Sequence, residues 1–129
     1  MPALIALLML VLAALGLRSA DPATRASGTS ALAASRLEIV VVEERDCIYC
    51  QLFRRDLFPA YVASPRARAV PMRFLDLGEL ASSSLKLKQQ VDVVPTVLVL
   101  SQGSEIGRIP GYASREVFFN SINALLPPQ

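Results

Sequence analysis

The order of apolar and polar positions after residue 36 predicts a succession of strands and helices. Segment 37–43 is β-branched and almost continuously apolar, which is typical of a strand buried on both faces. Shorter apolar runs predict further strands at 72–76, 96–100 and 105–109. The chain therefore contains the elements of a sheet, and its first strand is expected to be buried on both faces.

Apolar residues at helical spacing predict three helices. The first is expected from Cys47 to about Tyr61, capped by Asp46, with these residues facing the core: Cys50, Phe53, Leu57 and Tyr61. The second is expected over 80–91, where the apolar line is Leu80, Leu87 and Val91. The third is expected over 114–126, opened by Ser114, with this buried side: Val117, Phe118, Ile122, Leu125 and Leu126.

The resulting order, β-α-β-α-β-β-α, restricts the topology. A helix that connects the first two strands implies a parallel pair. The turn at 101–104, which contains Gly103, implies that the last two strands are antiparallel. We therefore expect an α/β domain over 37–129, with a central mixed sheet flanked by helices.

The N-terminal segment has a different composition from the rest of the chain. Leu4 to Leu17 is a 14-residue apolar run interrupted only by Gly16, which suits the hydrophobic region of a signal peptide better than a full membrane span. We expect a signal peptide over 1–20, with an uncertain cleavage site, and a linker or partial helix over 21–36. Because no Lys or Arg precedes the apolar run, an uncleaved membrane anchor remains an alternative.

Charge and composition exclude several classes of function. The formal net charge is +2 and the charges are mixed, so neither a nucleic-acid surface nor a polybasic membrane surface is expected. The sequence contains no histidine, which excludes Ser-His-Asp and Cys-His catalysis and HExxH zinc chemistry. Two cysteines are left to carry the chemistry.

The two cysteines form the motif Cys47-Ile48-Tyr49-Cys50, placed where the first strand meets the first helix. At a helix N-terminus, Cys47 meets free N–H groups and the positive end of the helix dipole, which stabilise a thiolate. Cys50 lies one turn deeper on the same face. Cys47 is therefore expected to attack a disulfide, and Cys50 to resolve the mixed disulfide. Arg45 favours the thiolate and Asp46 opposes it.

Other interpretations of the motif remain open. A structural disulfide over so short a loop stabilises little, about 2 kcal/mol by loop entropy. The two cysteines could also be half of a zinc site, but the sequence contains no further Cys or His to complete it. A Cu(I)-binding module also carries Cys-x-x-Cys after its first strand, since thiolates suit Cu(I). A redox dithiol is favoured, and neither a cofactor nor a bound metal is predicted.

A second group of residues follows at Val94-Pro95-Thr96. Pro95 at the start of a strand fits either an ordinary trans proline or a cis Val94–Pro95 bond beside the disulfide. The cis form would turn the Val94 backbone outward, where it could pair with an extended client segment. Gly111, with Tyr112 beside it, is interpreted either as a close-approach position on the same rim or as a turn before the last helix.

Taken together, residues 37–126 resemble the thioredoxin superfamily. The resemblance is carried by the strand before the cysteine motif, by Val94-Pro95-Thr96, and by the series Gly103, Gly107 and Gly111. More narrowly, the chain is similar to SoxS-type periplasmic thioredoxins of sulfur-oxidising bacteria, on these residues: Val42-Glu43, Tyr49, Gly107-Arg108-Ile109, Gly111-Tyr112 and Phe118-Phe119.

This resemblance implies a thioredoxin-like fold and a periplasmic enzyme that reduces disulfides of client proteins and keeps a sulfur-carrier protein active. It implies that Cys47 is the nucleophile, Cys50 the resolving thiol and Pro95 the cis-proline. Four residues are expected to bind the client: Tyr49, Val94, Pro95 and Gly111. The expected partners are a client with a reactive cysteine and a membrane electron donor, and the enzyme is expected to act as a monomer.

The chain departs from thioredoxins at two positions. Asp46 stands where they have a Trp, and Val41 stands where they have a buried, proton-accepting carboxylate. Proton transfer is then left to Glu43, Glu44 or water, although Glu43 also fits a solvated acid at a strand end. No counterpart of the glutathione-binding Gly-Gly-x-Asp of glutaredoxins is found, which argues against glutathione use. A Cu(I) chaperone-like module and a disulfide oxidase or isomerase remain the functional alternatives.

Overall fold

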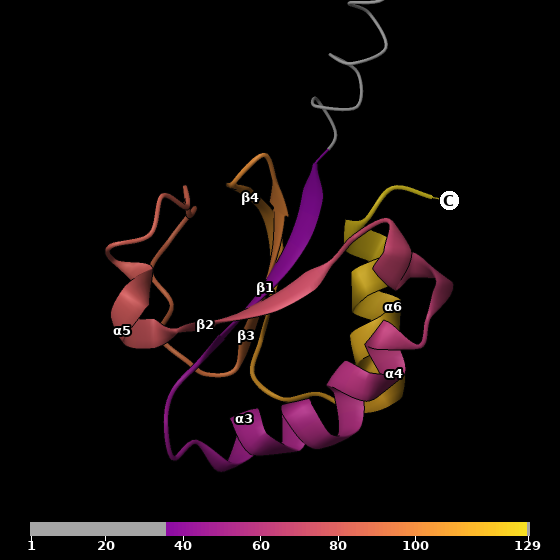
Figure 1. The fold of residues 1–129 in the computed structure, drawn as a ribbon, viewed down its shortest axis with the longest axis horizontal. Coiled ribbons are helices and arrows are strands. Elements are labelled where there is room, and N and C mark those ends of the chain that lie inside the picture. Colours follow the sequence, from indigo (N-terminus) through magenta and orange to yellow (C-terminus); the bar gives the residue numbers. More distant parts are fainter. Residues whose placement is uncertain (1–35, 129) are drawn as a thin grey trace, which may run out of the picture. The chain divides into compact units, whose positions relative to one another are not determined.

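A four-stranded mixed sheet forms the centre of the computed structural model, which describes residues 36–128 (Figure 1). The strands are β1 (Leu37–Glu43), β2 (Met72–Asp76), β3 (Thr96–Ser101) and β4 (Ser104–Pro110), in the order β2-β1-β3-β4. β1 pairs parallel with β2, and the β1–β3 and β3–β4 pairs are antiparallel. The expected mixed sheet and strand directions are confirmed.

The central strand β1 is covered on both faces. Ile39, Val40, Val41 and Val42 have no exposed surface, which explains why the segment is apolar without alternation. The odd-numbered pair contributes to one core and the even-numbered pair to the other, because successive side chains point to opposite faces of a strand.

Helices cover one face of the sheet. α3 (Ile48–Leu52), the π-helix η1 (Phe53–Leu57) and α4 (Phe58–Val62) form one continuous helical run, and α6 (Arg115–Leu125) packs beside it (Figure 1). The four expected core positions of the first helix are all buried, with at most 3 % of their surface exposed: Cys50, Phe53, Leu57 and Tyr61. This helix matches its prediction except at its N-cap.

The π-helical turn has a local cause in the sequence. Pro59 has no N–H to donate to the carbonyl four residues earlier, and its ring would clash with that carbonyl. The N–H of Phe58 instead donates to the carbonyl of Phe53, five residues back. The widened turn lets the helical run pass Pro59 and keep Tyr61 on the core face.

The other face of the sheet is covered mainly by a loop, and here the predicted helix over 80–91 is wrong. The helix α5 spans only Leu77–Leu80, and the hydroxyls of Ser82 and Ser83 then donate to the carbonyls of Glu79 and Leu80. Such local hydrogen bonds compete with helix continuation.

Beyond the serines the loop becomes extended. Lys86 forms an isolated parallel bridge with Ser104, through a bond from its N–H to the carbonyl of Gly103. Leu85 and Leu87 therefore both point to the sheet while Lys86 is exposed, which is a period of two rather than a helical period. A helix of 3₁₀ type, η2 (Pro65–Arg68), precedes β2.

The last helix, α6, begins after Ser114, whose hydroxyl accepts a hydrogen bond from the N–H of Val117. Phe118, Ile122 and Leu126 are buried, and Leu125 is half-buried, as expected. The prediction that Val117 is buried is wrong, because 53 % of its surface is exposed. Only one narrow stripe of this helix contacts the sheet, and Val117 lies outside it.

The expected signal peptide over 1–20 and most of the linker over 21–36 lie outside the described residues. No helix within residues 36–128 is both long enough and apolar enough to cross a membrane.

Candidate active site

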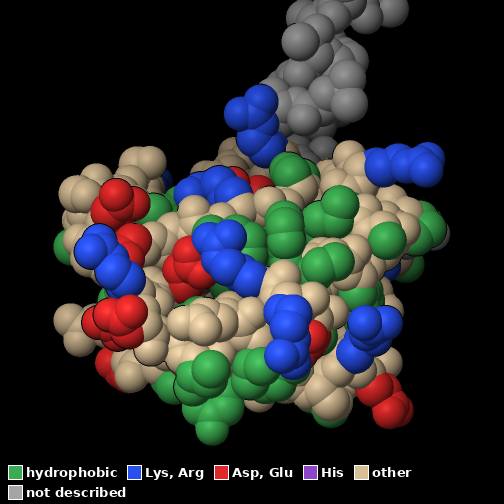
Figure 2. Space-filling view, turned by 60° about the horizontal axis from the view of Figure 1, so that its bottom comes forward, with side chains coloured by type: hydrophobic (Ala, Val, Ile, Leu, Met, Phe, Trp, Pro, Cys, Tyr) green, Lys and Arg blue, Asp and Glu red, His purple; other side chains and the backbone are tan. Residues whose placement is uncertain are grey.

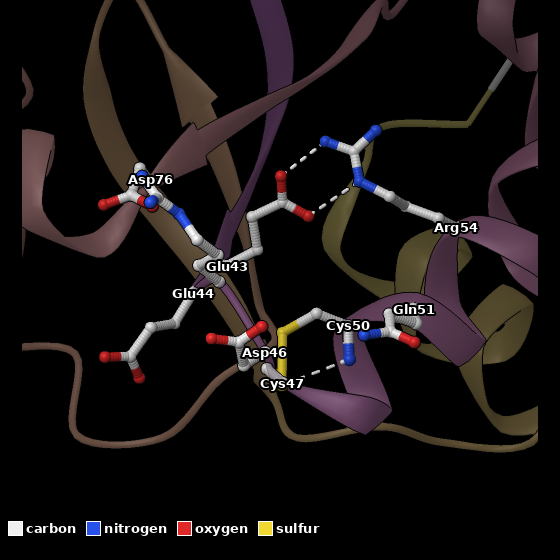
Figure 3. A pocket seen from close by; sticks show the side chains of 9 residues that line it. Glu43, Glu44, Asp46, Cys47, Cys50, Gln51, Arg54 and Asp76 are labelled. Carbon is white, nitrogen blue, oxygen red and sulfur yellow. Dashed lines mark hydrogen bonds and ion pairs between the residues drawn. A yellow bond between two sulfur atoms is a disulfide. The ribbon is translucent and has the colours of Figure 1, made fainter.

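The two cysteines lie at the junction of β1 and α3, as the motif predicts. Cys47 and Cys50 form a disulfide with a Cα–Cα distance of 5.3 Å (Figure 3). Cys47 is partly exposed, whereas only 3 % of Cys50 is exposed. An external sulfur can therefore reach Cys47 more easily than Cys50.

The N-cap of the helix is Cys47, so the prediction that Asp46 caps it is wrong. Asp46 has a φ of 66°, in the left-handed region, whereas an N-cap needs the extended backbone that Cys47 has. The Sγ atom of Cys47 instead accepts the N–H of Cys50 at 3.2 Å. That N–H points at the sulfur on which a thiolate would form, and it stabilises negative charge there.

The Val94–Pro95 peptide bond is cis, as the second interpretation of Pro95 proposed. The Val94 carbonyl oxygen lies 3.8 Å from the Sγ atom of Cys47, although 47 residues separate them in sequence. Two hydrogen bonds hold the backbone on either side: the Thr96 hydroxyl donates to the Val93 carbonyl at 2.6 Å, and the Gly111 N–H donates to the Pro95 carbonyl at 2.8 Å. The structure thus brings Val94 to Cys47, and Gly111 to Pro95 next to it.

Gly111 has a φ of 79°, which favours glycine, and a Cβ atom placed there would meet no protein atom within 4 Å. Its conformation rather than crowding within the chain accounts for the glycine. Next to it, the ring of Tyr112 stacks on that of Tyr49, with centroids 6.3 Å apart.

Asp56 was not recognised in the sequence as part of the site. Its carboxylate accepts the hydroxyl of Tyr112 at 3.2 Å and also pairs with Arg55. The hydrogen bond from Arg55, more than any other contact, lowers the pKa of Asp56. Removal from water, reinforced by the bond to Asp56, raises the pKa of Tyr112. Asp56 thus anchors the ring on which Tyr49 stacks.

Exposed apolar surface gathers around the cysteines. The large hydrophobic residues with the most exposed surface include Ile48 and Tyr49, with 60 % and 56 % exposed, and Val93 of the cis-proline loop has 46 % exposed. Figure 2 brings forward the end of the molecule that carries α3 in Figure 1, and there basic and acidic side chains are interspersed with hydrophobic ones. Such apolar surface beside a reactive sulfur suits contact with another protein chain.

An open cavity of about 300 Å³ lies beside the disulfide. It is lined by the turn before Cys47, by both cysteines, and by these residues: Glu43, Gln51, Arg54 and Asp76. Glu43, at the end of β1, projects into it and accepts hydrogen bonds from Nε and Nη2 of Arg54 (Figure 3). Arg54 also lies over the ring of Phe74, 3.7 Å from its centroid.

The contact with Glu43 raises the pKa of Arg54, chiefly through its hydrogen bond, while partial burial opposes the rise. Glu43 is therefore an ion-paired carboxylate and not a freely solvated acid. Val41, which precedes it on the same face of β1, is fully buried in the core beside the helix. Nothing in the sequence indicated Arg54 as the partner of Glu43, because the two residues are 11 positions apart. Within residues 36–128, no group of three or more Cys, His, Asp or Glu side chains could hold a metal ion.

The mixed sheet, the cysteine pair at the helix N-terminus and the cis-proline beside it define a thioredoxin-like thiol-disulfide oxidoreductase. A family model described as a thioredoxin-like domain matches residues 29–126, so the chain belongs to that family. Both the fold class and the enzyme class expected from the sequence are confirmed. No protein with a curated description matched the sequence.

Solved structures give a more detailed comparison. The chain is similar to the reduced periplasmic thioredoxin SoxS from Paracoccus pantotrophus, with 26 % identity and a TM-score of 0.64; the match covers 69 % of this chain and 94 % of that one. The thioredoxin of Malassezia sympodialis matches with 14 % identity and a TM-score of 0.58, covering 74 % of this chain and 81 % of that one. Mitochondrial thioredoxin 3 of Saccharomyces cerevisiae matches with 18 % identity and a TM-score of 0.54, covering 77 % of this chain and 88 % of that one. The last two show the fold alone.

Proposed function

We propose that the protein is an exported reductant of disulfides in periplasmic client proteins, with Cys47 as the attacking thiol and Cys50 as the resolving thiol. The observation that carries this proposal is the difference in burial between Cys47 and Cys50, together with the Val94–Pro95 backbone that approaches Cys47. Similarity to a periplasmic thioredoxin and the apolar N-terminal segment support export.

The reaction balances as two successive displacements. The Cys47 thiolate attacks one client sulfur, the client S–S bond breaks, and its second sulfur leaves as a thiolate. Cys50 then loses its proton and attacks the Sγ atom of Cys47. The client leaves with two reduced sulfurs, and the Cys47–Cys50 disulfide has taken their place. A membrane electron donor must supply two electrons and two protons before the next turnover.

Client binding is assigned to the rim around Cys47. An extended client segment would pair with the backbone of Val94, next to Pro95, in a short β-addition. The open space beside Gly111 leaves room for the client backbone, and Tyr49, supported by Tyr112, offers an apolar surface for its side chains. Among possible clients, we propose a sulfur-carrier protein, because of the similarity to SoxS.

The test is mixed-disulfide trapping in the periplasm with Cys50→Ser, expressed with its own leader. This variant can attack but cannot resolve, so partners captured through Cys47 can be identified by mass spectrometry. A single dominant partner with an exposed thiol or sulfur-carrier cysteine is expected. The matched control is Cys47→Ser/Cys50→Ser, which should capture nothing.

Two results would refute the proposal. If no Cys47-dependent adduct forms and the reduced protein instead holds Cu(I) stably, the chain is a copper-binding module. If the reduction potential lies near about −120 mV rather than about −270 mV, the protein oxidises its clients instead of reducing them. Capture of many unrelated proteins would keep the reductase activity but contradict a dedicated client.

A further inference from the structure

Arg108 and Glu105 form the most enclosed ion pair among residues 36–128. Their side chains are 13 % and 2 % exposed, and Nη2 of Arg108 lies 2.6 Å from Oε2 of Glu105. A second bond joins Nε to Oε1 at 2.6 Å. The pair lowers the pKa of Glu105 and raises that of Arg108, in both cases chiefly through these hydrogen bonds. Neither residue contacts the disulfide, so a role for this pair has to be sought in the residues that it does contact.

A β-bulge in β4 makes this pair possible. Gly107 pairs with Val99 and Glu105 pairs with Leu100, so Ile106 is an extra residue between them. In a regular strand, residues three apart point to opposite faces. The extra residue reverses which face of the sheet the following side chains point to. Glu105 and Arg108 therefore pair with Leu100 and Leu98, whose side chains belong to the second core, on the face that also holds Val40 and Val42. Both charged side chains therefore face the loop 81–95.

The Arg108–Glu105 pair forms hydrogen bonds with the middle of that loop. Arg108 donates Nη1 to the Gln90 carbonyl at 2.9 Å and Nη2 to the Gln89 carbonyl at 2.8 Å. The carboxylate of Glu105 accepts the N–H of Lys88 at 2.9 Å. Three consecutive residues of the loop are thus bound to β4 through their backbone.

The three bound residues lie only a few positions before Val94 in the sequence. Only three residues, Val91 to Val93, separate Gln90 from Val94, whose carbonyl lies against Cys47. The far end of this short segment is already fixed by the Thr96 hydroxyl, which binds the Val93 carbonyl. Because the segment has no helix or strand of its own, its near end is held by the hydrogen bonds from Arg108 and by Val91, which packs against the second core.

We propose that Arg108, oriented by Glu105, is a positioning residue that holds the Val93–Pro95 segment in the conformation that receives the client backbone. This inference rests on the proposed function, because it assumes that clients pair with Val94. It assigns to the Arg108–Glu105 pair a role in client affinity, exerted through the loop and not at the sulfurs. A small disulfide, which reaches Cys47 without β-addition, should not depend on it.

The test compares two substrates on Arg108→Lys. Lysine retains a positive charge for Glu105, but its single ammonium group cannot donate at the same time to both loop carbonyls and to the carboxylate. For insulin disulfides, we expect KM to rise by about tenfold with little change in kcat, the scale of one hydrogen bond to a charged group. For 5,5′-dithiobis(2-nitrobenzoate), the rate should stay within about twofold, and the reduction potential should not change. Hydrogen exchange of the amides at 91–94 should become faster.

Controls separate positioning from general stability. Arg73→Lys alters the Arg73–Glu38 pair, which lies on the opposite edge of the sheet, and should leave both substrates unaffected. Glu105→Gln keeps an acceptor for the Lys88 N–H but loses the charge that orients Arg108, so a smaller rise in KM is expected.

The inference is overturned if Arg108→Lys lowers both rates in parallel, or if KM for insulin does not change while the protein remains folded. If the wild-type protein reduces the small disulfide but not insulin, and Cys50→Ser traps no partner, the proposed function itself fails. The two failures can be told apart by the wild-type protein: it reduces insulin if only the role of Arg108 is wrong, and it does not if the proposed function is wrong.

Discussion

The carboxylate of Glu43 accepts two hydrogen bonds from the guanidinium of Arg54, in the same cavity that Cys50 lines. Glu43 lies two residues along β1 from Val41, the position at which the resemblance to thioredoxins places a carboxylate. Residues two apart on a strand share a face, so Glu43 looks toward the helix that carries Cys50. The chain thus offers an acid on the same side of the sheet, nearer the strand end and held by a cation.

A first prediction concerns proton transfer from Cys50. If Glu43 receives this proton, directly or through water, Glu43→Gln should slow the resolving step and prolong the life of the mixed disulfide by about tenfold or more. Quenched-flow trapping of the adduct measures this directly. Because Arg54 and Glu43 are both partly exposed, the same change should cost only about 0.2–1 kcal/mol of stability. Glu38→Gln is the matched control, and an unchanged adduct lifetime in Glu43→Gln would assign the proton to water.

A second prediction concerns Asp46, which lies beside Cys47 in the cavity (Figure 3). Its negative charge opposes formation of a thiolate at Cys47. Asp46→Asn should therefore increase the alkylation rate of Cys47 at neutral pH by about two- to fivefold and make the protein a weaker reductant. Asparagine tolerates the left-handed backbone at this position, so the free energy of unfolding should change little. A rate that does not change, measured at low ionic strength, would contradict this role.

A third prediction follows from the lowered pKa of Glu105. Since the unfolded chain binds a proton at this group at a higher pH than the folded chain, stability is lost as pH falls from the ordinary glutamate range toward the lowered value. The contribution is fully present above that range, while Arg108 stays charged throughout. Urea midpoints of the wild-type protein and Glu105→Gln should differ at pH 7, and the difference should shrink as the pH falls below the ordinary glutamate range toward the lowered pKa of Glu105. A difference that does not depend on pH would show that the charge is unimportant.

A fourth prediction tests the core beneath the site. Phe118 is 1 % exposed, and its ring meets those of Phe53, Tyr61 and Phe119 edge-on. Phe118→Ala should lower the free energy of unfolding by about 3–5 kcal/mol, because it leaves a cavity between the helices and the sheet. Val117→Ala, one residue earlier and exposed, should stay within about 0.5 kcal/mol. Denaturant unfolding of the two variants provides the comparison, and equal effects would contradict the packing of α6.

The sequence by itself determined the features that depend on neighbours along the chain. Continuous apolar residues indicated that β1 is buried on both faces, and four residues at helical spacing marked the buried side of the first helix. Ser114 marked the start of α6 through its hydroxyl, and the cysteine motif at a strand-helix junction was enough to indicate redox chemistry. Each of these rests on periodicity, capping or spacing over a few residues.

Only the tertiary structure decided the features that depend on distant residues. The apolar line over 80–91 fitted a helix, but serine hydroxyls and a bridge to Ser104 made the segment a loop. Arg108 reaches this loop because a single extra residue, Ile106, shifts the phase of β4. Glu43 with Arg54, and Tyr49 with Tyr112, are paired by the fold across 11 and 63 residues respectively. Such contacts leave no periodic trace in the sequence, because strand pairing and loop closure bring their partners together, and local preference does not.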